Sequence, residues 1–154
     1  MKDEIACVFL DDYCIVFSTN QVEKLLCLNY VYKEKAKEIV SKVQKSNTCK
    51  NVIENIENID KSIEGKGSAI FNKMLFKLDI EKIENGFSEE NKELTFNKIK
   101  KIVEDKKFKE KFEGLEIDYK KMKISYSEEN RFKVISLLLD RASQTMLFGD
   151  KFLN

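Results

Sequence analysis

The sequence predicts a helix-rich α+β fold in a single domain, residues 1–154, with two β-hairpins and five or six helices. Three observations lead to this prediction. The length of 154 residues fits one domain of ordinary size. Two segments, at about 5–18 and 115–126, have strand patterns interrupted by short turns. The segments between them repeat their apolar residues at three- and four-residue steps, as the buried faces of helices do.

The first hairpin is predicted from two β-rich runs, residues 5–10 and 13–18, that are separated by Asp11 and Asp12. A tight two-residue turn sets the register of the two strands. Because both faces of the hairpin are apolar, we expect it to lie inside a sheet or to be covered on both sides. The expected opposing pairs are Leu10 with Tyr13 and Val8 with Ile15.

Helices are predicted after this hairpin from apolar periodicity and capping residues. A short helix is expected at 21–28, after Asn20, and a longer one at 30–45. Asn47 or Thr48 can cap the next helix. Its apolar stripe consists of Val52, Ile53, Ile56 and Ile59.

Two further helices are expected before the second hairpin. One begins at Ser68, after a break at the Gly-Lys-Gly segment 65–67. It runs on toward Ile83, and Gly86 stops it. The other, at 95–106, is amphipathic, with apolar residues on one face and lysines on the opposite face.

The second hairpin has the clearest strand pattern in the chain. Apolar residues alternate with polar or charged ones in 115–119 and again in 122–126, so one face is expected to be buried and the other solvated. In the expected register the apolar pattern and the charge pairing agree. The opposing pairs are Tyr119 with Met122, Ile117 with Ile124, and Asp118 with Lys123.

A last helix follows Ser127, which is expected to be its N-cap, and Gly149 is its expected end. No internal repeat, linker or low-complexity segment divides the chain, which favours one domain. The apolar stripe of this helix consists of Phe132, Ile135, Leu138 and Leu139.

Charge is nearly balanced, with 28 basic and 27 acidic residues, so no net field steers the whole molecule toward nucleic acid or an anionic membrane. Any basic patch must therefore be local. Only Arg131 and Arg141 are arginines, and lysine lacks the planar fork that binds a phosphate or a guanine through two hydrogen bonds. This composition disfavours sequence-specific DNA recognition.

No segment approaches the roughly 18 consecutive apolar residues of a membrane span. The first ten residues also lack the basic and long apolar regions of a signal peptide. These features predict a cytoplasmic protein without direct membrane insertion. In that compartment the four cysteines, which lack a CxxC spacing, are expected to be reduced thiols. They are Cys7, Cys14, Cys27 and Cys49.

The absence of histidine removes the commonest general base and every histidine-ligated zinc site. Walker and Rossmann loops are also missing, because segment 65–67 lacks the required glycine spacing and a preceding strand. Asp11 and Asp12 are two carboxylates in a turn, which is too few oxygen ligands for a calcium loop. We therefore expect no catalytic residue, no metal site and no cofactor.

Lysines concentrate in one segment, residues 98–111. Its seven lysines and three acidic residues give a local net charge of +4. A solvated helix face is the simpler interpretation of this segment. Contact with nucleic-acid phosphates is the sharper one, because lysines can follow a phosphate backbone without reading bases. The candidate nucleic-acid-binding residues are Lys98, Lys100, Lys101, Lys106, Lys107, Lys109 and Lys111.

Several short stretches, taken in their order, resemble the KwaB family, the soluble component of the Kiwa anti-phage defence system. Together they cover most of residues 13–152. The matching pieces are YCIVF at 13–17, VEKLL at 22–26, YKEKA at 32–36, LTFNKIKKI at 94–102, KISY at 123–126, LLLD at 137–140 and FGDKF at 148–152.

The resemblance implies a protein of bacterium–phage conflict that binds DNA, self-associates and works beside a small membrane protein. Family members usually carry an additional N-terminal half, so the resemblance relates this chain to their C-terminal domain. A copy trimmed in this way could instead serve a phage or plasmid as an inhibitor of a host defence protein such as a CRISPR nuclease.

Two functions are therefore expected. The first is a non-enzymatic, KwaB-like protein that contacts DNA weakly and independently of sequence, and that forms homo-oligomers. The second is a phage- or plasmid-encoded inhibitor that binds a protein of the host defence machinery. An enzyme ranks third, because the sequence has no constellation of catalytic residues.

Overall fold

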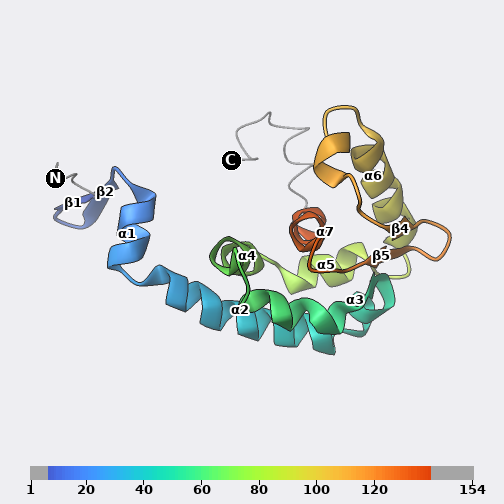
Figure 1. Cartoon of the computed structure of the whole chain (residues 1–154), viewed down its shortest axis with the longest axis horizontal. Coiled ribbons are helices and arrows are strands. Elements are labelled where there is room, and N and C mark those ends of the chain that lie inside the picture. Colours follow the sequence, from blue (N-terminus) through green and yellow to red (C-terminus); the bar gives the residue numbers. More distant parts are fainter. Residues whose placement is uncertain (1–6, 140–154) are drawn as a thin grey trace.

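The computed structural model describes residues 7–139, which form short strands, seven α-helices and two 3-10 helices (Figure 1). It confirms the predicted helix-rich α+β class, with more helices than the five or six expected. In chain order the elements are β1 (Cys7–Leu10), β2 (Tyr13–Val16), α1 (Thr19–Leu25), α2 (Leu28–Lys45), α3 (Asn47–Val52), β3 (Ile53–Glu54), η1 (Ile56–Ile63), α4 (Ser68–Leu75), α5 (Ile80–Gly86), α6 (Lys92–Glu104), η2 (Lys109–Phe112), β4 (Ile117–Asp118), β5 (Lys123–Ser125) and α7 (Arg131–Leu138).

The longest helix, α2, forms one side of the fold, and α4, η1 and α3 pack against it (Figure 1). Its buried residues Ala36, Val40 and Val43 recur at three- and four-residue steps, so one stripe of the helix faces the core. On the other side of the core, Phe71 of α4 meets Phe132 of α7 edge to face, with ring centroids 5.6 Å apart. The core therefore joins the middle of the chain to α7.

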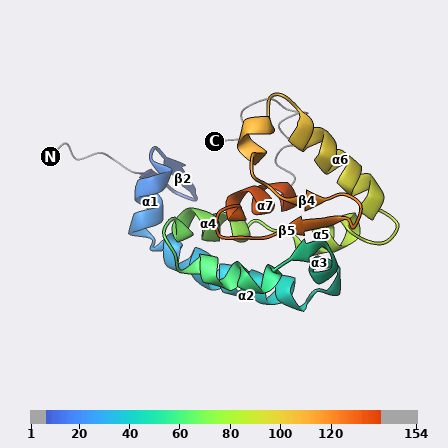
Figure 2. The same cartoon turned by 45° about the vertical axis from the view of Figure 1, so that its right-hand side comes forward.

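The first hairpin has the predicted register, in which Leu10 pairs with Tyr13 and Val8 with Ile15. Its predicted burial is wrong. All four residues of β2 are exposed, and no third strand pairs with β1 or β2 among residues 7–139. The reason is its position: the hairpin and α1 extend beyond the N-terminal end of α2, away from the core (Figures 1 and 2).

The second sheet contains three strands in the order β3-β5-β4, so β5 is its central strand. The antiparallel register of β4 and β5 confirms two predicted pairs, Ile117 with Ile124 and Asp118 with Lys123. The strands are shorter than the expected runs of alternating residues. The central strand β5 also contacts α3.

The prediction of one helix that includes Ile53 is wrong, because α3, β3 and η1 take its place. After α3, Ile53 enters β3 and pairs in parallel with Ile124 of β5. Asn55, with a φ of 61°, then turns the chain into η1. The backbone N–H of Tyr126 donates to the carbonyl of Glu54 at 3.0 Å. The apolar periodicity misled because a 3-10 helix also repeats its side chains at three-residue steps.

The helix expected to run from Ser68 toward Ile83 is interrupted. α4 ends at Leu75 and α5 begins at Ile80. Between them, the side chain of Asp79 accepts a hydrogen bond from the backbone N–H of Lys82 at 3.2 Å and so caps α5. The break at 65–67 and the helix end at Gly86 agree with the prediction.

Three helix caps differ from those expected. Ser18, and not Asn20, is the N-cap position of α1, which begins at Thr19. Ser46 caps α3, since its hydroxyl accepts from the backbone N–H of Cys49 at 3.2 Å. Before α7, Ser127 and Asn130 instead close a local turn. The Ser127 hydroxyl accepts from the Asn130 N–H at 3.3 Å, and the Asn130 amide oxygen accepts from the Ser127 N–H at 2.8 Å. The expected helix end at Gly149 lies outside the described residues.

Candidate interaction surfaces and a buried polar network

The seven candidate lysines lie on α6, on η2 and on the turn between them, and all seven are exposed. α6 is anchored from its other side by Phe96, Ile99 and Ile102, none of them more than 5% exposed. Phe108 and Phe112 anchor η2 in the same way. Because the apolar side is buried in the core, the lysines face solvent. We name this set the lysine surface: Lys98, Lys100, Lys101, Lys106, Lys107, Lys109 and Lys111.

The lysines of α6 project from more than one side of the helix and do not form a single stripe. At about 100° per residue of an α-helix, Lys98 and Lys100 project from flanks roughly 160° apart, with Lys101 between them. Lys100 is the most constrained of the three. Its Nζ lies 4.0 Å from the carboxylate of Glu104 and 5.6 Å from the ring centroid of Tyr119. The positive charge is therefore distributed around more than one side of α6.

Ion pairs neutralise little of this charge within residues 7–139. Lys107 and Lys111 place their ammonium groups 5.9 and 6.0 Å from the ring centroid of Phe108. A cation–π contact leaves the ammonium group positively charged. Four members form no ion pair with another described residue: Lys98, Lys101, Lys106 and Lys109.

Lys120 is a neighbour of this surface that the sequence interpretation missed. Because Tyr119 lies beside Lys100, the turn between β4 and β5 lies next to α6. Asp118 orders this turn by accepting the backbone N–H groups of Lys120 and Lys121 at 3.0 and 2.9 Å. The bond from Lys121 is also the largest cause of the lowered pKa of Asp118. The exposed Lys120 therefore adds a further positive charge at the edge of the lysine surface.

A second exposed surface is apolar and lies at the opposite end of the molecule from α6 (Figures 1 and 2). Five large apolar residues between Leu10 and Phe17 have exposed fractions of 44% to 76%. Soluble proteins rarely expose so many neighbouring large apolar residues, so such a patch indicates an interaction site. We name it the apolar surface: Leu10, Tyr13, Ile15, Val16, Phe17, Leu25, Leu26, Tyr30 and Val31.

Polar contacts hold α1, and with it this surface, against the body of the fold. Glu23 of α1 forms an ion pair with Lys73 of α4, and the Glu23 side chain is only 14% exposed. The Lys73 ammonium also lies 5.8 Å from the ring centroid of Tyr32. The Tyr32 ring in turn meets Phe76 at 5.4 Å between centroids. Specific tertiary contacts therefore hold α1, which carries part of the apolar surface, against the fold.

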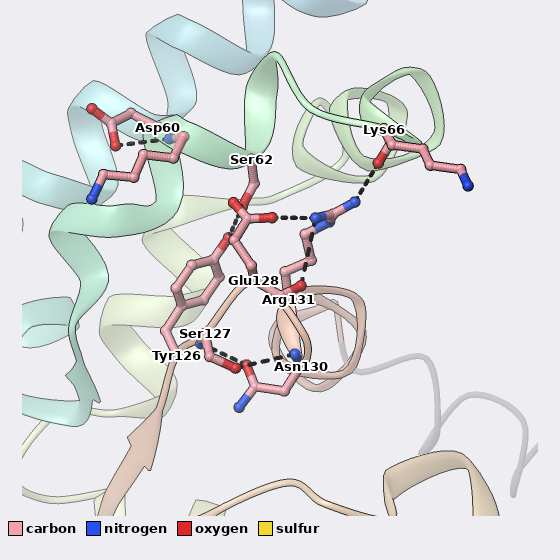
Figure 3. Close-up of polar contacts among 9 residues, drawn as sticks. Asp60, Ser62, Lys66, Tyr126, Ser127, Glu128, Asn130 and Arg131 are labelled. Carbon is pink, nitrogen blue, oxygen red and sulfur yellow. Dashed lines mark hydrogen bonds and ion pairs between the residues drawn. The ribbon is translucent and has the colours of Figure 1, made fainter.

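Four side chains form a polar network between η1 and the start of α7 (Figure 3). The Ser62 hydroxyl donates to Glu128 Oε1 at 2.5 Å and lies 2.6 Å from the Tyr126 hydroxyl. Serine has one hydroxyl proton and a carboxylate only accepts, so the Tyr126 hydroxyl donates to Ser62. Arg131 pairs with Glu128 and donates to the backbone carbonyl of Lys66 at 2.5 Å.

The burial of this network argues for a structural role. Ser62 is 0% exposed and Tyr126 is 2% exposed, so a substrate in solution cannot reach either hydroxyl. Burial raises the pKa of Tyr126 to about 12, which keeps its hydroxyl protonated at neutral pH. The network therefore fastens η1 to the segment that leads into α7.

An open groove of about 720 Å³ lies between the end of α2 and the start of α5. Ser46 borders it, and its hydroxyl donates to Glu84 Oε1 at 2.6 Å. Since the same hydroxyl caps α3, this contact ties three helices together. None of the lysines proposed from the sequence lines the groove. Its lining consists of Ile39, Lys42, Lys45, Ser46, Leu78, Asp79, Ile80, Glu81 and Glu84.

The cysteines Cys7, Cys14, Cys27 and Cys49 are free thiols. Burial raises the pKa of the Cys49 thiol, and desolvation together with the nearby Cys7 raises that of Cys14. A raised pKa leaves less of the reactive thiolate. Across residues 7–139, no group of three or more His, Cys, Asp or Glu side chains is placed to hold a metal ion. No helix in the same range has both the length and the apolar character to cross a membrane.

The sequence matches no protein-family model, and no curated protein or solved structure is significantly similar to the chain. The lysine surface and the apolar surface are therefore the features from which a function can be argued.

Proposed function

We propose that this chain is a non-enzymatic, KwaB-like binding protein of bacterium–phage conflict that contacts DNA through the lysine surface. The exposure of all seven lysines supports this proposal. Four of them form no ion pair with another residue in 7–139, so their ammonium groups are available to anions. Phosphates repeat along a DNA backbone and accept such point charges without regard to base sequence.

The expected mode of binding follows from the charge distribution. The whole chain carries a net charge of only +1, so no long-range attraction adds to the local contacts. Lysines alone give little base recognition, because the bidentate contacts that read guanine are typical of arginine. Binding should thus be weak, insensitive to sequence and strongly weakened by added salt.

A charge-reversal experiment tests the proposal. The test variant carries Lys101→Glu, Lys106→Glu and Lys109→Glu, all on the lysine surface. We expect it to lose at least about tenfold in affinity for duplex DNA and to reduce the salt slope by roughly 0.9 per lost phosphate contact. The readout is fluorescence anisotropy of labelled duplexes of two unrelated sequences at several salt concentrations.

A matched control variant reverses three exposed lysines on other parts of the fold. It carries Lys50→Glu, Lys66→Glu and Lys77→Glu, and so changes the net charge by the same amount. If both triple variants lose DNA binding equally, only net charge matters and the lysine surface is not the site. A wild-type protein that does not bind either duplex at low salt contradicts the DNA proposal outright.

The second candidate function is a phage- or plasmid-encoded inhibitor that binds a protein of host defence. The apolar surface favours it, because exposed apolar residues such as Tyr13 and Leu25 are typical of protein-binding sites. The same DNA titration separates the two functions. Absence of DNA binding together with unchanged folding leaves the inhibitor as the function that the exposed residues support.

A further inference from the structure

The first hairpin is an incomplete sheet. β1 and β2 pair only with each other among residues 7–139, so each strand has one unpaired edge. In an antiparallel pair, alternate residues of each strand direct their backbone N–H and C=O groups away from the partner strand. An isolated two-stranded sheet is at best marginally stable in water, and further strands usually complete it.

The two strands carry no charge, proline or bulge to protect such an edge. Proteins commonly block exposed edges with lysine, proline, bulges or inward-pointing charges. β1 and β2 contain no charged residue and no proline, and the carboxylates of Asp11 and Asp12 are confined to the turn. The register of the pair is also regular, without a bulge. This edge is therefore suited to accept another strand.

We propose that β2 pairs antiparallel with β2 of a second copy of this chain, giving a four-stranded sheet around a twofold axis. β2 is the better edge because all four of its residues are exposed, whereas Cys7 and Val8 of β1 are half-buried. A twofold interface requires one strand that complements itself. β2 meets this requirement because it has no charges that would repel their own copies.

We place the twofold axis of this dimer at Ile15 of β2. This register puts Ile15 opposite Ile15 of the second copy, Cys14 opposite Val16, and Tyr13 opposite Phe17. It keeps equivalent sheet faces on the same side, because residues opposite each other share a face. Asp12 remains outside the paired region, so no carboxylate is buried. The apolar faces that are exposed in one copy become continuous across two.

The exposed apolar area sets the upper limit of such an interface. Leu10, Tyr13, Ile15, Val16, Phe17, Leu25 and Leu26 expose between 44% and 76% of their surface. At about 150–200 Å² for a large side chain, they present on the order of 700 Å² per copy. Two copies together reach the roughly 1,200 Å² at which stable interfaces begin. This inference does not depend on the DNA proposal, since it uses residues at the other end of the molecule.

Sedimentation velocity over a concentration series tests the dimer. We expect the wild-type chain to convert from monomer to dimer as its concentration rises through the micromolar range. Ile15→Lys places two ammonium groups at the axis and should weaken association at least tenfold. Leu94→Lys is the matched control, because Leu94 is 58% exposed on α6, outside the apolar surface, and association should be unchanged. Circular dichroism verifies that both variants keep the helical fold.

A cross-link tests the register independently. In a background with Cys7, Cys14 and Cys27 replaced by serine, Ile15→Cys should form an intermolecular disulfide under mild oxidation, whereas Leu94→Cys should not. A monomer at all concentrations up to roughly 200 μM, a dimer that survives Ile15→Lys, or an open-ended series of oligomers overturns the proposal. Binding of the monomer to a strand of another protein, without self-association, overturns it as well.

Discussion

The hydroxyl of Ser62 joins two parts of the chain that are 64 residues apart, because it lies 2.6 Å from the hydroxyl of Tyr126. Ser62 is fully buried, and a buried hydroxyl without a partner would cost about 1–3 kcal/mol. Its two hydrogen bonds remove that cost. No local pattern marks Ser62 as buried, since its burial depends on a tyrosine supplied by the second hairpin. The sequence alone could not predict this network.

The raised pKa of Tyr126 predicts a pH dependence of stability. The folded state holds the Tyr126 proton up to about pH 12, whereas tyrosine in the unfolded chain titrates near pH 10. The contribution of the protonated Tyr126 hydroxyl to the free energy of unfolding is therefore fully present below about pH 10. It is lost as the pH rises to about 12, which lowers the free energy of unfolding by about 2–3 kcal/mol. Urea unfolding followed by circular dichroism between pH 9 and pH 12 measures it.

Two phenylalanine substitutions separate this effect from general alkaline unfolding. Tyr126→Phe should make the stability less dependent on pH in that window, because the titrating hydroxyl is gone. Tyr30→Phe is the control, since Tyr30 is 68% exposed. If both variants keep the full wild-type slope, Tyr126 does not cause the alkaline loss of stability.

Gly67 and Gly65 offer a matched pair for testing backbone conformation. Gly67 has a φ of +78° before α4, and an added Cβ would lie 3.6 Å from the guanidinium of Arg131. Gly67→Ala should thus destabilise the fold by about 1–2 kcal/mol, chiefly through backbone strain. An added Cβ at Gly65 meets nothing within 4 Å, so Gly65→Ala should be neutral or slightly stabilising. Equal thermal unfolding midpoints for the two variants would contradict this.

The exposure of the candidate lysines could be predicted from the sequence, but their neighbours could not. The stripe of Phe96, Ile99 and Ile102 determines which side of α6 is buried, and helical periodicity reveals that stripe. The contact between Lys100 and Tyr119 depends on how the second hairpin packs beside the helix. No spacing within either segment contains that information. The same limit explains why Lys120 was missed.

At the scale of elements, local pairing was predictable and long-range pairing was not. The second hairpin has its predicted register because alternation and the Asp118–Lys123 pair specify it within a few residues. β3 contains only two residues, and its strand conformation comes from pairing with β5. The first hairpin shows both sides of this limit. Its register follows from the turn between its two strands. Its exposure depends on whether other elements of the fold cover it, which no local pattern shows.

Because β5 is the central strand, a charge at its buried isoleucine should destabilise the fold more than a charge at the isoleucine of β4. Ile124 is 0% exposed, and Ile124→Lys places an unpaired charge in the core, which should cost at least about 3 kcal/mol and abolish cooperative folding. Ile117 on β4 is only partly buried, so Ile117→Lys should cost less, about 1 kcal/mol. Chemical unfolding of both variants gives the comparison. A smaller loss for Ile124→Lys than for Ile117→Lys would refute the assignment of β5 as the buried strand.

At the scale of the whole molecule, the lysine surface and the apolar surface are separate. The lysine surface lies on α6 and η2, and the apolar surface lies around the first hairpin and α1, at the other end of the fold (Figures 1 and 2). The composition, with 28 basic and 27 acidic residues, gives no hint of this arrangement. A polyanion and an apolar partner can therefore bind without competing for the same residues.

The parallel pairing of β3 with β5 also determines when a newly made chain can fold. Glu54 and Ser125, which pair across these strands, are 71 residues apart. A ribosome releases β3 before β5, so the nascent chain carries an unpaired strand and an open core while the chain between these positions is made. Contacts between such distant residues form slowly, because the intervening chain must be ordered first. The core can close only after β5 and α7 have both emerged, and until then the exposed apolar residues favour aggregation.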